Sequence, residues 1–177
     1  VIKRRAKFLS LPLSTNNGQS MLTFDFLKMD VKKSKLTAEV IMKYLKSSSR
    51  IQIKTDAGTD LTLMKRGRMP GFFNGVTADG GGFSSASIEV YIPVEECGPN
   101  GTMVIDGSLG YIGAAREDTR VVFKEGRIVE IEETPTGKRL KEYMEGYHDS
   151  GIYVAGELGI GLNSYSQCAG RGYIEGE

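Results

Sequence analysis

The chain has 177 residues, 40% of them apolar and 25% charged, a composition typical of a globular protein with one well-filled core or two small ones. Its 23 basic and 22 acidic residues leave a net charge of +1, so the charge does not favour nucleic acid or a membrane surface as a partner. No apolar run approaches the roughly 18 residues of a membrane span, and the first residues do not resemble a secretion signal.

The first predicted element is a helix. Thr37 is suited to cap its start, apolar residues recur on one face up to Leu45, and a run of serines follows Lys46 and ends it. Residues 1–36 are mixed and basic, and we interpret them as a separate N-terminal segment, such as the end of a preceding domain. Residues 37–177 would then form a second domain, which we expect to be incomplete at its C-terminus.

Short strands dominate the rest of the chain. Apolar or alternating runs bounded by turn residues predict strands at 50–55, 59–64, 88–92, 102–106, 120–123, 127–131 and 152–155. Residues 66–86 are rich in glycine and predict a long loop, and residues 136–147 predict a second helix. About seven strands, mostly in hairpins, favour an α+β fold with a mixed, largely antiparallel sheet and a few packing helices.

The cysteines and the histidine bear on the compartment and on metal binding. Cys97 and Cys168 lie far apart in the sequence, which favours free thiols and a reduced, cytoplasmic setting. Because His148 is the single histidine, a metal site made by this chain alone would consist mostly of carboxylates. The chain begins without methionine and ends at Glu177 without a closing helix pattern, so we expect it to be a fragment of a longer protein.

Glu157 is the first candidate for chemistry. It interrupts residues 152–160, a stretch that otherwise holds only apolar residues and glycine. Such a pattern predicts a buried strand that leads into a tight, glycine-rich turn. A buried carboxylate is costly unless it has a partner, so we expect Glu157 either to accept hydrogen bonds from loop amides or to bind a metal.

Glu89 is the second candidate. On the predicted strand 88–92, Ile88 and Val90 share one face while Glu89 and Tyr91 share the other, which either faces solvent or meets Glu157. Carboxylates that meet in a partly desolvated site repel each other unless a cation neutralises them. A shared metal site requires their carboxyl oxygens to lie within about 6 Å of each other, and opposite faces of a sheet would exclude it.

Several segments resemble the aminopeptidase T family of thermophilic metallopeptidases. The most specific is Ala155-Gly156-Glu157-Leu158-Gly159-Ile160-Gly161-Leu162-Asn163, which resembles that family's Ala-Glu-Leu-Gly-Ile-Gly-x-Asn segment. Segments 51–61, 88–95, 101–108 and 123–129 follow in the family's order. The resemblance covers roughly residues 37–175.

This resemblance implies a hydrolase, a metallo-aminopeptidase in which two divalent ions (zinc, cobalt or manganese) activate a water that attacks the peptide bond at a free N-terminus. It implies that Glu89 and Glu157 are two of the metal ligands. The family's other ligands, histidines and an aspartate, come from segments C-terminal to the Glu157 motif, so we expect the chain as given to be inactive. The resemblance also implies peptide substrates and a homodimer, with neither nucleic acid nor a membrane as a partner.

Two alternatives remain open. The same superfamily resembles iron-dependent ring-cleaving dioxygenases that act on dihydroxypyridines, which implies a small aromatic substrate and a non-haem iron site of two histidines and a carboxylate, built downstream of this chain. The other alternative is a non-catalytic binding or assembly domain, in which the glycines at 80–82 approach a ligand or a partner.

Overall fold

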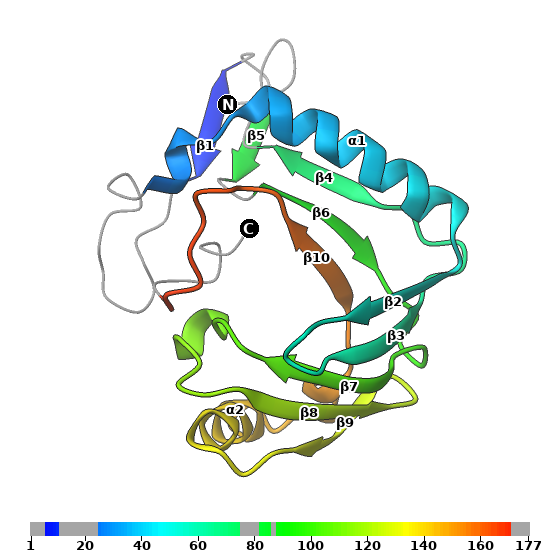
Figure 1. Cartoon of the computed structure of the whole chain (residues 1–177), viewed down its shortest axis with the longest axis vertical. Coiled ribbons are helices and arrows are strands. Elements are labelled where there is room, and N and C mark those ends of the chain that lie inside the picture. Colours follow the sequence, from blue (N-terminus) through cyan, green and yellow to red (C-terminus); the bar gives the residue numbers. More distant parts are fainter. Residues whose placement is uncertain (1–5, 11–24, 75–81, 86–87, 171–177) are drawn as a thin grey trace.

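A computed structural model describes residues 6–10, 25–74, 82–85 and 88–170 (Figure 1). It is an α+β fold with mainly antiparallel sheets, as predicted. In chain order the elements are β1 (Lys7–Ser10), η3 (Asp25–Lys28), α1 (Val31–Ser47), β2 (Arg50–Lys54), β3 (Asp60–Met64), β4 (Gly71–Asn74), β5 (Gly82–Ser85), β6 (Ile88–Pro93), β7 (Asn100–Ile105), η4 (Gly110–Ile112), β8 (Thr119–Lys124), β9 (Arg127–Ile131), α2 (Pro135–Glu145), η5 (Ser150–Tyr153) and β10 (Glu157–Gly161).

A three-stranded antiparallel sheet has the order β10-β6-β4, and α1 covers one of its faces (Figure 1). Val90 and Ile92 of β6 are fully buried against Ala38 and Leu45 of the helix. These residues lie on alternate positions of the strand and on one face of the helix, so burial of both apolar faces stabilises the pair. Within the described ranges, no helix packs on the opposite face of this sheet (Figure 1).

A five-stranded antiparallel sheet has the order β2-β3-β7-β8-β9, and α2 packs beside β8 and β9. Its core includes Leu61, Leu63, Val121 and Phe123, and Leu158 of β10 contacts both this core and the core beneath α1. A separate parallel pair, β1 with β5, makes the strand arrangement mixed.

Lys65, directly after β3, is 2% exposed and joins the end of this strand to the end of α1. Its Nζ donates hydrogen bonds to the carbonyl oxygens of Leu45 at 2.6 Å and Ser48 at 2.7 Å. The last carbonyl groups of a helix lack partners within the helix and favour a nearby cation. Lys65 therefore caps α1 from inside the protein.

Three predictions about strands were wrong. The glycine-rich stretch 66–86, expected to be a loop, contains β4 and β5, while residues 75–81 lie outside the described ranges. The last strand was expected at 152–155, but Ser150–Tyr153 is a 3-10 turn that Asp149 caps by accepting the Gly151 N–H. The glycines after Glu157 were expected to form a turn, but they continue in extended pairing with β6. The last strand is therefore β10 and begins at Glu157.

The two helices were located correctly, but α1 starts earlier than predicted. Asp30 is its N-cap, since one carboxylate oxygen accepts the N–H groups of Lys32 and Lys33. The helix thus spans the expected boundary between residues 1–36 and 37–177, and that division stays a prediction. Neither helix in the described ranges is long and apolar enough to cross a bilayer.

Candidate functional site

The face of the three-stranded sheet opposite α1 carries both predicted site residues, Glu89 and Glu157. In the β6–β10 pairing, Glu89 lies opposite Gly161, Tyr91 opposite Gly159 and Pro93 opposite Glu157. Residues directly opposite each other in an antiparallel pair point to the same face. Glu157, Gly159 and Gly161 are exposed there, whereas the intervening residues of β10 pack toward α1. The condition that Glu89 and Glu157 share a face is therefore met.

The two carboxylates come from opposite ends of this strand pair. Four residues of β10 separate Glu157 from Gly161, the partner of Glu89, which corresponds to roughly 13 Å along an extended strand. The Glu89 side chain bridges part of this separation, because its Oε2 lies 2.6 Å from the position that a Cβ atom would occupy at Gly159. Joint binding of one metal by Glu89 and Glu157 stays a prediction.

Two aromatic rings occupy the other half of the same face. Phe73 of β4 and Tyr91 of β6 are stacked, with ring centroids 4.9 Å apart and an interplanar angle of 24°. The Tyr91 ring lies over Gly71, where a Cβ atom would come within 2.3 Å of the ring carbon Cζ. Phe73 remains 42% exposed. The face thus combines a carboxylate that leans toward β10 with an aromatic pair that leans toward β4.

Glycines make this arrangement possible. Gly71 and Gly159 lie directly opposite Tyr91 on its two neighbouring strands, and a side chain at either position would collide with Tyr91 or Glu89. From the sequence, the glycines near Glu157 were predicted to form a turn, and Gly71, Phe73 and Tyr91 were not predicted as site residues. The signal that could have found them is a glycine inside a strand, which often marks close approach of another group.

Glu157 does not have the burial that first drew attention to it. It is the first residue of β10 and it is exposed, so the interpretation as a buried carboxylate held by loop amides is wrong. The strand itself is half-buried, since Leu158 and Ile160 pack inward while Glu157 alternates outward.

The described residues do not fit a complete metal site. No three His, Cys, Asp or Glu side chains gather within the described ranges to form a ligand set. The histidine, His148, lies just beyond the C-terminal end of α2. Catalytic zinc and non-haem iron sites use about three protein ligands, and Glu89 and Glu157 would supply two carboxylates. Glu89 and Glu157 alone therefore do not complete such a site.

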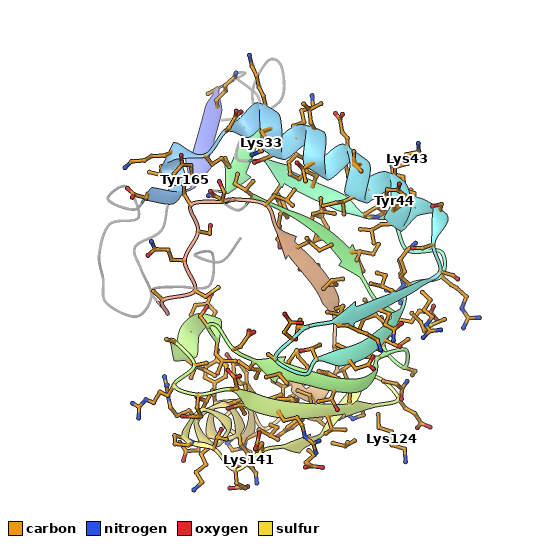
Figure 2. All side chains as sticks on the ribbon, in the orientation of Figure 1. Lys33, Lys43, Tyr44, Lys124, Lys141 and Tyr165 are labelled. Carbon is orange, nitrogen blue, oxygen red and sulfur yellow. The ribbon has the colours of Figure 1, made fainter. Side chains whose placement is uncertain are left out.

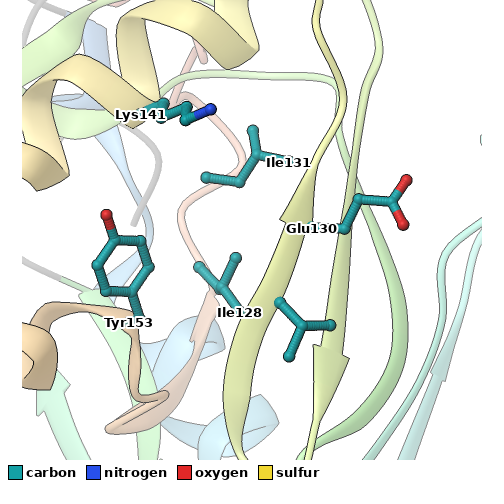
Figure 3. Close-up of a pocket in the computed structure, with 6 residues that line it drawn as sticks. Ile128, Glu130, Ile131, Lys141 and Tyr153 are labelled. Carbon is teal, nitrogen blue, oxygen red and sulfur yellow. The ribbon is translucent and has the colours of Figure 1, made fainter.

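Among the hollows beside α2, a groove and a pocket lie against the five-stranded sheet. A groove of 660 Å³ is lined mainly by apolar side chains that include Ile105, Leu109 and Met144. A smaller pocket of 280 Å³ lies beside β9, where Figure 3 shows Lys141 and Tyr153 near two isoleucines and Glu130 turned to the other side of the strand. The groove also includes Asp106 and Tyr143, whereas the stacked Phe73–Tyr91 pair beside Glu89 lies on the three-stranded sheet.

Comparison with known proteins identifies the family. The family model for 2,5-dihydroxypyridine 5,6-dioxygenase, NicX, matches residues 25–172. The chain belongs to this family. No curated protein matches the chain.

Two solved structures resemble the NicX-family chain. A 2,5-dihydroxypyridine dioxygenase from Pseudomonas putida KT2440 is 20% identical with a TM-score of 0.67, over 76% of this chain and 40% of that chain. Wild-type AmpT from Thermus thermophilus is 19% identical with a TM-score of 0.56, over 75% of this chain and 35% of that chain. At these identities the two structures support the fold. This chain spans less than half the length of either.

The family assignment corrects the main functional prediction. The expectation of a hydrolase, specifically a metallo-aminopeptidase acting on peptides, is wrong, because the family model is that of a dioxygenase. The findings support the dioxygenase alternative instead. The likeness to aminopeptidase T holds in the fold, as the AmpT structure indicates. The segment around Glu157 forms strand β10 of this sheet. Its sequence does not distinguish a peptidase from a dioxygenase.

Proposed function

We propose that the protein containing this sequence is a ring-cleaving dioxygenase that acts on a dihydroxylated pyridine or a closely similar small aromatic compound. The observation that carries the proposal is the match of residues 25–172 to the NicX family model. In such a reaction both atoms of O₂ enter the substrate and one ring bond breaks, so no external reductant is needed.

We propose that the exposed face of the β10-β6-β4 sheet is one wall of the active site. Glu89 is the residue best placed to contact a ring hydroxyl, since its carboxylate lies across Gly159 beside Tyr91. A carboxylate has several acceptor positions, so Glu89 can accept a hydrogen bond from a substrate hydroxyl in addition to its contacts within the protein.

Metal binding by Glu89 and Glu157 belongs to this proposal as well. The family suggests iron in place of the zinc, cobalt or manganese first expected, and iron, when bound, would supply O₂ activation. Because two carboxylates are fewer than the ligands such a site needs, further ligands must come from outside the described residues. The proposed substrate is a small aromatic compound, in place of the peptide first expected. The homodimer stays a proposal.

The test of activity uses the full-length protein, loaded with Fe(II) without oxygen. We expect it to consume one O₂ for each 2,5-dihydroxypyridine, with loss of the ring's ultraviolet absorbance. A leucine p-nitroanilide assay with Co(II) or Zn(II) serves as the comparison, and it should give no cleavage. Absence of O₂ uptake with every dihydroxylated ring tested would contradict the proposal.

The test of ligand roles compares Glu89→Gln and Glu157→Gln with the wild type. Iron per chain is measured by elemental analysis, alongside O₂ consumption. A ligand role predicts loss of bound iron in each variant, because a neutral amide is a weaker ligand for iron than a carboxylate. Wild-type iron content in either variant would exclude that residue as a ligand, whatever its activity.

A further inference from the structure

The exposed aromatic pair on β4 and β6 has features of a preformed binding surface. Tyr91 lies against the backbone of β4 at Gly71, so its ring has little freedom to move. Phe73 stacks on Tyr91 yet remains 42% exposed. A large apolar ring that remains exposed beside a carboxylate, on the sheet face opposite α1, is suited to contact a ligand.

We propose that Phe73 and Tyr91 form the platform on which the aromatic ring of the substrate stacks, beside Glu89. This inference rests on the proposed function and names the residues that recognise the ring. These are substrate-contacting residues, which select a flat ring over an extended peptide.

The geometry favours a planar ring that carries a hydroxyl group as the ligand. Aromatic rings attract each other in offset stacks, so a flat ring can stack on the exposed ring of the platform. The Glu89 carboxylate lies over Gly159, the register partner of Tyr91, so a ring on the platform lies beside that carboxylate. A hydroxyl group on the ring can then donate a hydrogen bond to Glu89, which a plain benzene ring cannot do.

Gly71 provides an independent way to perturb the platform. In Gly71→Ala the new methyl group would lie 2.3 Å from the Tyr91 ring, so the ring must move although Tyr91 itself is unchanged. Gly156→Ala is the matched control, because its Cβ atom meets nothing within 4 Å and its backbone does not require glycine. A second control is Tyr44→Ala, which removes an exposed ring from the outer side of α1 (Figure 2).

The experiment uses the full-length protein and two separate readouts. The dissociation constant of 2,5-dihydroxypyridine is titrated without oxygen, and KM and kcat are measured by O₂ uptake. Phe73→Ala and Gly71→Ala should each raise the dissociation constant and KM about tenfold, as expected for loss of one stacked ring, with kcat within about twofold of wild type. Phe73→Tyr should restore wild-type binding, and both controls should match the wild type.

The outcomes distinguish the Phe73–Tyr91 platform from the proposed dioxygenase activity. If the wild type consumes O₂ but Phe73→Ala binds the ring as tightly as wild type, the platform is wrong and the proposed function stands. If the wild type binds the ring without O₂ uptake and Phe73→Ala weakens that binding, the platform stands and the dioxygenase proposal fails. A wild type that neither binds nor oxidises the ring overturns both. Thermal unfolding of each variant verifies that the fold is intact.

Discussion

Replacing Lys65 by methionine tests whether a buried ammonium group caps α1. The substitution keeps a side chain of similar length and removes the charge. The Leu45 carbonyl retains other donors, because both the N–H and the Oγ of Ser48 lie within hydrogen-bonding range of it. The Ser48 carbonyl, in contrast, loses the donor at 2.7 Å.

The expected loss of stability follows from these contacts. A buried carbonyl left without its partner costs about 1–3 kcal/mol. Loss of the cation at the helix C-terminus adds about 0.3–2 kcal/mol, while removal of a buried charge offsets part of the sum. We expect Lys65→Met to lower the free energy of unfolding by about 2–3 kcal/mol, which corresponds to a drop of roughly 4–12 °C in Tm for a chain of this size.

Urea unfolding followed by circular dichroism measures this loss, with an unchanged m-value as the sign that the native fold is retained. Lys46→Met is the matched control, since Lys46 lies in the last turn of the same helix but is exposed. It should change stability by about 0.5 kcal/mol or less. Equal effects of the two substitutions would refute the argument, because they would show that burial of Lys65 contributes nothing.

Three further predictions concern single positions. Gly159→Ala should displace the Glu89 carboxylate and reduce turnover at least about tenfold with little change in Tm, because the group that must move is the end of a flexible side chain. Glu117 accepts the backbone N–H of Thr136, the second residue of α2, and this bond holds the pKa of Glu117 below its ordinary value of 4.5. Its stabilising effect is thus present above that pH and lost as the pH falls through the folded-state pKa, so urea midpoints of Glu117→Gln should show a weaker acid dependence than wild type. Gly126→Ala should prevent folding or cost more than about 3 kcal/mol, since its Cβ would lie 1.5 Å from a carbonyl oxygen, whereas Gly67→Ala, also at positive φ but in open space, should cost about 1 kcal/mol in the same unfolding assay.

The hairpins and helices could be predicted because their signals are local. In β2 and β3 the alternation of side chains matches the alternation of burial, and a short turn joins the strands. In α2, Thr134 caps the start and Pro135 occupies the first turn, so the helix begins within one residue of the expected position. Each of these elements depends on residues that are close together in the sequence.

The edges of the three-stranded sheet could not be predicted in the same way. β4 and β10 contain glycines that predict loops when only neighbouring residues are considered. They are strands because both pair with β6, whose apolar residues are buried beneath α1. That pairing joins residues far apart in the sequence, and the close approach of Tyr91 and Glu89 requires glycine at the positions where local propensity opposes a strand.

The same contacts explain why a correct fold led to the wrong reaction. The segment around Glu157 determines that β10 pairs with β6 and that Gly159 leaves room for the Glu89 carboxylate, and these are requirements of the sheet. A carboxylate at this position is compatible with either kind of reaction, so its presence does not decide between a water and an O₂ molecule as the reactant. What distinguishes the two on this face is the ligand that the neighbouring surface fits. An exposed ring stacked on Tyr91 fits a flat aromatic substrate, and Phe73 is therefore the more discriminating residue for function, although Glu157 has the more conspicuous sequence motif.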